Sequence, residues 1–201
     1  MVGNLGTGWY GAAKRSIDFY DLKGVIEGLL EASSVTDYEI RSAALSTFHP
    51  GRCAELWHNN VSFGVLGEVH PEVTESFDLS DRAYLFELNL DTIATLANPE
   101  KQFVPIPTHP GISRDLAILV DENLPADQPL TVIRSMGKEL VSQAYLFDLY
   151  TGNQVPEGKK SLAYSIAYHA KTESLTDAEV DEVHNRIIDK LTSRFQAELR
   201  T

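Results

Sequence analysis

The sequence is poor in cysteine, in long apolar runs and in basic residues. Cys53 is the only cysteine among 201 residues, which excludes an internal disulfide framework and a cysteine-rich zinc site and favours the cytosol. No run of about 18 apolar residues is present, and the N-terminal stretch lacks the apolar core of a signal peptide. We therefore expect a cytoplasmic chain with no membrane partner.

Basic side chains are outnumbered by acidic ones. The 17 lysines and arginines against 29 aspartates and glutamates give a formal charge of −12. Indiscriminate nucleic-acid binding depends on positive fields, so no DNA partner is expected, and any RNA contact must be local or helped by another chain. Residues 1–107 carry 7 basic and 15 acidic groups (−8), whereas residues 108–201 carry 10 and 14 (−4), so the second half repels a polyanion less.

Motifs of catalysis and metal binding are also missing. The sequence contains no Gly-rich phosphate loop, no G-x-S-x-G elbow, no H-E-x-x-H and no paired cysteines. The histidines His49 and His70 each precede a proline, which is typical of turns. We expect no catalytic residue, no metal ligand and no bound cofactor in this chain.

The first half combines one helix with several strands. Apolar residues recur at helical spacing from Asp18 to Leu30, and strand-like alternation follows in several short segments. Asn59-Asn60 is typical of a tight hairpin turn, and Asp91 is a plausible N-cap of a short helix. The pattern predicts an antiparallel sheet with helices packed on it, with strands within 38–44, 54–57, 61–69 and 83–90.

Four prolines between residues 98 and 110 predict a stiff connector and a domain boundary, giving domains 1–104 and 105–201. The second half predicts the order β-α-β-β-α-β, which is the ferredoxin-like unit, with its first and third strands central and both helices on one face. The whole chain is thus expected to be α+β. The elements expected after the boundary are a strand at 112–120, a helix at 130–140, a hairpin within 145–171, a helix from a capping box at Thr176 to about 196, and an edge strand at 197–200.

Several segments of the second half resemble a known family. THPGISRDLAILV, YLFDLYTGNQVPEGKKSLAYSIAY and SLTDAEV look like the ferredoxin-fold anticodon-binding domain that ends the β subunit of bacterial phenylalanyl-tRNA synthetase. DFYDLKGVIEGLL, FHPGRCAELW and FGVLGEVHPEV resemble the class II catalytic-like domain that precedes it. The resemblance covers nearly all of the chain from Asp18 onward.

This resemblance implies an incomplete class II synthetase-like sheet domain that has lost the reaction motifs, followed by an RNA-binding domain. It implies an α subunit as partner in an (αβ)₂ assembly, tRNA-Phe as ligand, and ATP and magnesium used by the whole phenylalanine–tRNA ligase rather than by this segment. The first domain would support α, and the second would bind the anticodon region. Family members usually carry an arginine before the L-T-D segment, which this chain lacks. If that arginine contacts RNA in relatives, the contact is either lost here or made by Lys171.

Candidate RNA-binding residues lie throughout the second domain, and each also has a structural interpretation. Arg114 could contact phosphate or a base, or form an ion pair with Asp115. Lys159, Lys160 and Ser161 could approach a phosphate or could be a solvated loop, and Tyr150 could stack on a base or lie in the core. Arg186 and Lys190 form part of a basic strip on the last helix, or a solvated face on which Glu182 pairs with Arg186.

Two alternatives remain open at the level of the sequence. The chain could be an assembly module without an RNA surface, or a small-molecule-binding protein, because ferredoxin-like domains host many functions. The sequence also does not distinguish a fragment of a longer chain from a stand-alone protein.

Overall fold

The structure is a computed structural model that describes residues 1–6, 15–98, 100, 110–137, 140–170 and 175–200. The chain divides into Met1–Phe103 (unit 1) and Val104–Thr201 (unit 2), each with its own hydrophobic core. None of the helices in the described ranges is long and apolar enough to cross a membrane.

Unit 1 contains the helix expected after Asp18. The Asp18 carboxylate accepts hydrogen bonds from the amides of Tyr20 (2.8 Å) and Asp21 (3.1 Å), and so begins helix α1 (Phe19–Ala32). Asp21 accepts the Asp18 amide in return and pairs with Arg15 at 2.5 Å. The hydrogen bond from Arg15 holds the pKa of Asp21 at about 2, so this carboxylate stays ionised at the helix start.

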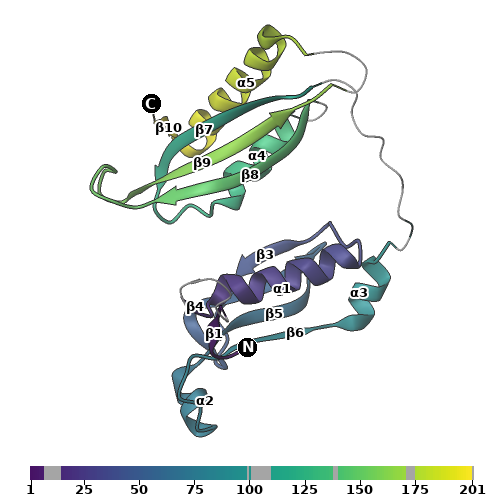
Figure 1. The fold of residues 1–201 in the computed structure, drawn as a ribbon, viewed down its shortest axis with the longest axis vertical. Coiled ribbons are helices and arrows are strands. Elements are labelled where there is room, and N and C mark those ends of the chain that lie inside the picture. Colours follow the sequence, from purple (N-terminus) through teal and green to yellow (C-terminus); the bar gives the residue numbers. More distant parts are fainter. Residues whose placement is uncertain (7–14, 99, 101–109, 138–139, 171–174, 201) are drawn as a thin grey trace. The chain divides into compact units, whose positions relative to one another are not determined.

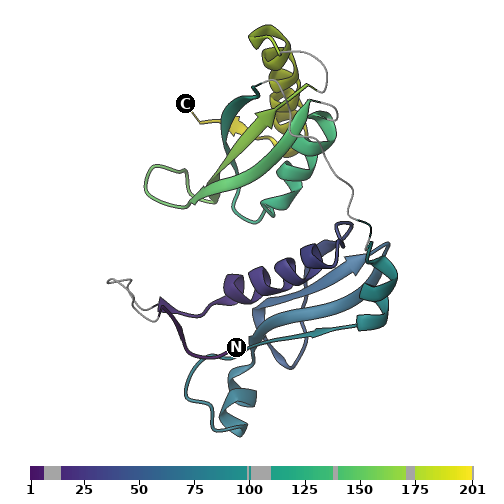
Figure 2. The same ribbon diagram turned by 45° about the vertical axis from the view of Figure 1, so that its right-hand side comes forward.

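Unit 1 also contains a four-stranded antiparallel sheet with the order β3-β4-β5-β6. Asn59 and Asn60 have φ angles of 45° and 64°, which confirms the expected tight turn between two of its strands. Helix α1 lies along one face of the sheet (Figures 1 and 2) and buries Leu22, Ile26 and Leu30 in the core. The strands are β3 (Glu39–Ser42), β4 (Phe48–His58), β5 (Val61–Val69) and β6 (Tyr84–Leu88), and β1 (Asn4–Leu5) and β2 (Arg15–Ser16) form a separate pair.

Two short helices complete unit 1: α2 (Pro71–Ser76), with proline at its first position, and α3 (Leu90–Leu96). The expectation that Asp91 caps the second of these is wrong. The Asn89 side chain accepts the Thr92 amide at 2.9 Å and is the N-cap, because Asp91 already lies inside the first turn.

Unit 1 contains a buried carboxylate, Glu68, that is paired with neighbouring side chains. Glu68 is only 4% exposed and accepts hydrogen bonds from Arg52 at 2.7 Å and from the Tyr84 hydroxyl at 3.3 Å. Burial and the Glu68 charge raise the pKa of Tyr84, so its hydroxyl remains a donor. A buried charge needs such partners, and this cluster is therefore a structural one.

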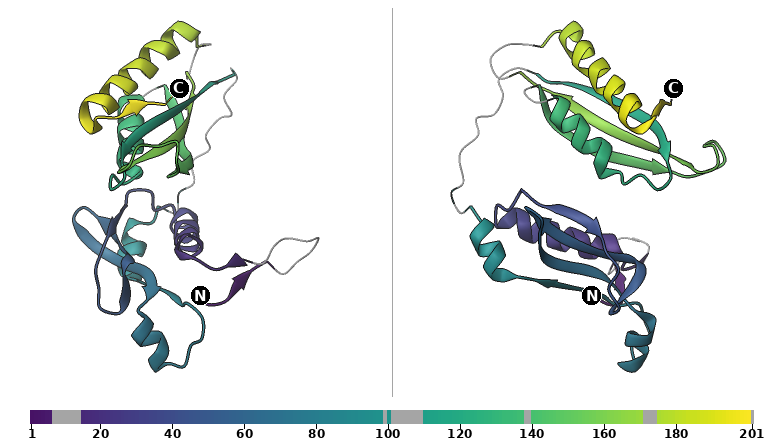
Figure 3. Two further views of the ribbon diagram at one scale, coloured as in Figure 1. Left: turned by 90° about the vertical axis from the view of Figure 1, so that its left-hand side faces the viewer. Right: turned by 180° about the vertical axis from the view of Figure 1, so that it is seen from behind.

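Unit 2 has the element order β-α-β-β-α-β and the sheet order β10-β7-β9-β8. The first and third strands are central, which confirms the ferredoxin-like topology. Both helices pack on the same face of the sheet (Figures 1 and 3). The elements are β7 (Ile112–Asp121), α4 (Asp127–Gly137), β8 (Val141–Tyr150), β9 (Lys159–Tyr168), α5 (Asp177–Phe195) and β10 (Glu198–Leu199).

Helix α4 begins three residues earlier than the predicted 130–140. Pro129 lies within its first turn, where a proline needs no amide hydrogen bond, and Asp127 adds a favourable negative charge there. The described part of the helix extends to Gly137, whose carbonyl accepts a hydrogen bond from the Leu140 amide at 2.9 Å, and residues 138 and 139 of the predicted helix lie outside the described residues.

The core of unit 2 lies between the sheet and its helices. Alternate residues of the central strands are buried there, and the Tyr164 hydroxyl donates to the Ala126 carbonyl at 2.7 Å. Burial raises the pKa of Tyr164 well above its usual value, so it stays neutral. The strand residues of this core are Leu116, Ile118, Val120, Leu162, Tyr164, Ile166 and Tyr168.

The predicted capping box of the last helix is confirmed. The Thr176 hydroxyl accepts the Glu179 amide at 3.4 Å, and the Glu179 carboxylate accepts the Thr176 amide at 2.9 Å. The Thr176 hydrogen bonds lower the pKa of Glu179. Because the pKa of Glu179 is depressed in the folded state, the stability that its hydrogen bonds with Thr176 contribute is present above the unfolded-state pKa of this carboxyl group. It is lost as pH falls through the folded-state pKa.

Thr176→Ala is expected to lower the free energy of unfolding of unit 2 by about 0.5–2 kcal/mol, because helix α5 loses its N-cap. Urea denaturation followed by circular dichroism measures the change. Thr131→Ala is the control, since the Thr131 hydroxyl only donates to the Asp127 carbonyl inside α4. An equal loss in both variants would contradict the capping role.

Candidate nucleic-acid interface

Among the described residues of unit 2, no helix covers one face of the sheet, which we call the helix-free face. Because side chains alternate along a strand, the residues between the buried positions of β7 and β9 point to this face. Cross-strand pairing arranges them in rows with residues of β8 and β10. The rows are Asp121 and Lys159; Glu198, Leu119, Ser161 and Tyr150; Ala117, Ala163 and Asp148; Asp115, Ser165 and Tyr145; and Ser113, Ala167 and Gln143.

Small side chains in the middle and aromatic side chains on β8 characterise this face. Ala163, Ser165 and Ala167 on β9 leave room above the sheet, and Tyr145 and Tyr150 next to them are 49% and 36% exposed. Exposed tyrosines beside small residues provide flat surfaces on which unpaired bases can stack. Tyr164 and Tyr168 are fully buried in the core, so of these four tyrosines only the two on β8 are exposed.

Hydrogen-bonding groups accompany the tyrosines. Asp148 is exposed and lies in register with Ala163, and Ser161 lies directly beside Tyr150. Carboxylates accept hydrogen bonds from base amino and imino groups, and these contacts do not depend on phosphate charge. Ser161 is only 4% exposed in this structure, so its hydroxyl would become accessible only if a neighbouring side chain moved.

Two cations lie at one end of the helix-free face. Lys159, which follows Gly158 at a φ of 77°, pairs with Glu198 of β10. Arg200 lies over the Tyr150 ring, with its guanidinium carbon 5.2 Å from the ring centroid, and donates to Gln154 at 3.2 Å. Arg200 could not be predicted from the sequence as part of this surface, because only the pairing of β10 with β7 brings the C-terminal residues to this end of the sheet.

Lys160 does not belong to the same surface as Lys159. It is in register with Val120, a core residue, and alternation directs it to the helix-covered face. The two adjacent lysines therefore point to opposite faces of the sheet, and an anionic ligand on the helix-free face would contact Lys159 but not Lys160.

Arg114 lies on the helix-covered side, in the same alternation as Leu116. Its guanidinium donates to Asp177 at 2.8 Å and lies 3.6 Å from Asp181, so the expected pair with Asp115 is wrong. Beneath α5, the Tyr168 hydroxyl and His184 Nδ1 are hydrogen-bonded at 2.8 Å. Burial and then the Arg114 charge lower the pKa of His184, and burial raises the pKa of Tyr168 to about 12.

Arg186 and Lys190 lie on the exposed side of α5, since the buried residues of that helix are Val180, Val183, Ile187 and Leu191. They are therefore separated from the helix-free face by the sheet. Among residues 175–200, Glu182 forms no ion pair with Arg186, so that expected pair is wrong. Lys171 lies outside the described residues.

Comparisons with known proteins match each unit to a family model. Residues 107–200 match the ferredoxin-fold anticodon binding domain, and residues 1–90 match the phenylalanyl tRNA synthetase beta chain CLM domain. Both units of the chain therefore match domains of the phenylalanyl-tRNA synthetase beta chain.

Individual beta subunits are similar in sequence over nearly the whole chain. The chain is 41% identical over 195 residues to the phenylalanine–tRNA ligase beta subunit of Clostridium tetani, covering 96% of the chain and 24% of that protein. It is 39% identical over 201 residues to the beta subunit of Symbiobacterium thermophilum, covering 100% and 22%. The chain thus spans about a quarter of the length of these relatives.

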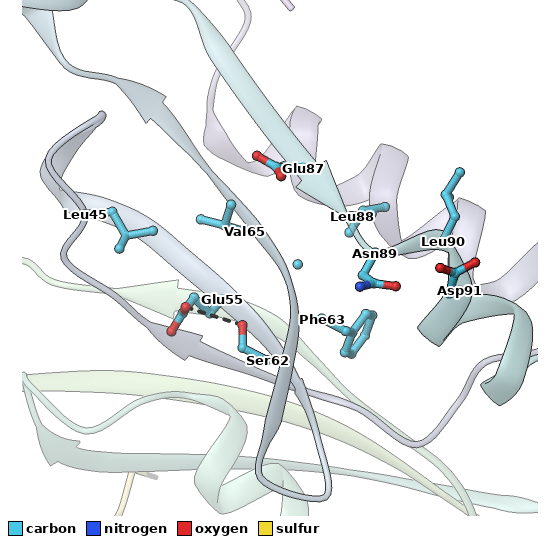
Figure 4. Close-up of a pocket in the computed structure, with 11 residues that line it drawn as sticks. Leu45, Glu55, Ser62, Phe63, Val65, Glu87, Leu88, Asn89, Leu90 and Asp91 are labelled. Carbon is cyan, nitrogen blue, oxygen red and sulfur yellow. Dashed lines mark hydrogen bonds between the residues drawn. The ribbon is translucent and has the colours of Figure 1, made fainter.

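The beta-chain CLM unit contains a cavity of about 530 Å³ that differs chemically from the helix-free face. Figure 4 shows Glu55, Glu87 and Asp91 around it together with Leu45 and Val65, and Ser62 donates to Glu55 at 3.3 Å. In the described part of the chain, no ion pair involves these three carboxylates, and no cluster of ligands suited to a metal ion is found. The carboxylates would repel a triphosphate, so the residues of this cavity do not fit ATP.

Proposed function

We propose that the chain is part of a phenylalanine–tRNA ligase, in which unit 2 binds the anticodon region of tRNA-Phe. The observation that supports this most strongly is the helix-free face, with Tyr145 and Tyr150 exposed beside the small residues of β9. In this proposal, anticodon bases stack on the tyrosines, Asp148 accepts hydrogen bonds at base edges, and Lys159 and Arg200 contact phosphates. Ser161 takes part only after a neighbouring side chain moves aside.

The charges on the helix-free face favour contacts with RNA bases over contacts with the RNA phosphate backbone. The helix-free face carries the carboxylates of Asp115, Asp121, Asp148 and Glu198 against the cations Lys159 and Arg200. Few phosphates can therefore be neutralised, so we expect a shallow dependence of affinity on salt. Binding would then require unpaired bases, which an anticodon loop presents.

Unit 1 has the complementary role of supporting the α subunit, which contributes the ATP- and magnesium-dependent chemistry. The proposed enzyme is a cytoplasmic (αβ)₂ heterotetramer. Holding the anticodon end of tRNA uses remote binding energy to orient the acceptor end toward the active site of α.

The adjacent lysines of β9 provide a test with an internal control. Lys159→Ala is expected to weaken binding of an RNA stem-loop with the tRNA-Phe anticodon by about twofold to fivefold at low salt, and to reduce the slope of log K against log salt by about 1. Lys160→Ala, which removes the same charge from the opposite face, is expected to leave both quantities nearly unchanged. Fluorescence anisotropy over a salt series measures both.

Equal effects of the two substitutions would contradict a binding surface restricted to the helix-free face. If the chain assembled with a phenylalanine–tRNA ligase α subunit in light scattering but no variant or wild type bound the stem-loop, the alternative of a pure assembly module would replace the proposal.

A further inference from the structure

The short strand β10 places an acidic side chain against the principal cation of the helix-free face. Glu198 is 61% exposed and forms an ion pair with Lys159, whose side chain is 33% exposed. Glu198 continues the row of Leu119, Ser161 and Tyr150 onto the edge strand β10, so this carboxylate lies at the border of the proposed RNA surface.

A phosphate must compete with this carboxylate for the same ammonium group. An exposed ion pair contributes little to stability, so folding alone does not explain why a carboxylate faces the cation of a proposed anion-binding surface. The pair does, however, lower the effective positive charge that any polyanion meets first. A ligand that also stacks on Tyr150 has additional binding energy with which to displace Glu198, whereas a ligand that offers only phosphates does not.

We infer that Glu198 is a specificity-determining residue that competes with nucleic-acid phosphates for Lys159 and so suppresses binding of polyanions that make no base contacts. This inference rests on the proposed function, since it assigns Lys159 to the RNA surface. Glu198 acts through Lys159 and does not itself contact RNA.

Glu198→Gln keeps the size and the backbone pairing of β10 while removing the competing charge. It is expected to tighten binding to heparin and to a single-stranded homopolymeric RNA by up to about fivefold, because Lys159 becomes free to contact one sulfate of heparin or one phosphate of the RNA. For the RNA, the slope of log K against log salt should steepen by about 0.7, the value for one contact to a single strand. Binding of the anticodon stem-loop should tighten less, so the ratio of specific to non-specific affinity falls.

Two further variants separate competition for Lys159 from a general change in charge. Glu122→Gln removes a carboxylate near the same hairpin end, where the Glu122 amide donates to the Gly158 carbonyl at 2.9 Å, and among the described residues Glu122 makes no ion pair. It should leave the salt slope unchanged. In a Lys159→Ala background, Glu198→Gln should no longer tighten heparin binding.

The outcomes separate this inference from the proposed function. If Glu198→Gln leaves heparin affinity unchanged, or tightens it equally with and without Lys159, Glu198 is not a competitor and the inference is overturned. If instead the wild type fails to bind the anticodon stem-loop while the Lys159-dependent effect on heparin persists, the competition stands and the proposed function fails.

Discussion

Tyr150→Ala is expected to weaken binding of the anticodon stem-loop by about 1–3 kcal/mol, or roughly fivefold to 150-fold, the contribution of one stacked base. Tyr150 lies on the helix-free face in register with Ser161, and its ring already accepts a planar cation, Arg200, at 5.2 Å. A surface that holds a guanidinium against a ring can hold a base in the same way. Fluorescence anisotropy at a fixed salt concentration measures the loss.

Two substitutions make the result specific to stacking. Tyr150→Phe retains the ring and should recover most of the affinity. Tyr20→Ala removes a tyrosine that is 75% exposed on α1 of unit 1, and it should have no effect on RNA binding. If Tyr150→Phe were as weak as Tyr150→Ala, the phenol hydroxyl rather than the ring would carry the contact.

Leu162→Ala is expected to lower the free energy of unfolding of unit 2 by about 2–5 kcal/mol. Leu162 is 0% exposed on the central strand β9, in register with Ile118. Removing its side chain leaves a cavity in a close-packed core, which surrounding residues fill only in part. Residue-resolved amide hydrogen exchange of the whole chain assigns the loss to unit 2.

Ser165→Ala on the same strand is the matched control. Ser165 points to the helix-free face, and its replacement should change stability by no more than about 0.5 kcal/mol. Similar losses of unfolding free energy in both variants would mean that alternate residues of β9 do not lie on a buried face and an exposed face. The assignment of the RNA surface to the helix-free face would then be wrong.

The topology of unit 2 could be predicted because local patterns there agree with one another. The alternation from Ser161 to Tyr168 and the capping box at Thr176 fix the order of elements, and the ferredoxin-like arrangement follows from that order. The predicted starts of helices α3 and α4 were less accurate. Several neighbouring residues can accept hydrogen bonds from the free amide groups of a helix start, so the sequence does not single out one of them.

The site could be predicted only in part because its residues meet through long-range pairing. Alternation showed that β9 has two faces, but not which one the helices cover. Arg114 pairs with Asp177 on a helix far along the chain, and Arg200 reaches Tyr150 only through the pairing of β10 with β7. Lys159 and Lys160, adjacent in sequence, were treated as one site although the sheet separates them.

The most direct test of the central claim is methyl NMR of the chain with labelled alanines during titration with the anticodon stem-loop. Ala117, Ala163 and Ala167 lie on the helix-free face, and Ala178 lies in the first turn of α5 on the helix side. RNA bound to the helix-free face should shift the first three methyl signals and leave that of Ala178 unchanged. Shifts at Ala178 with none at Ala163 would contradict the account.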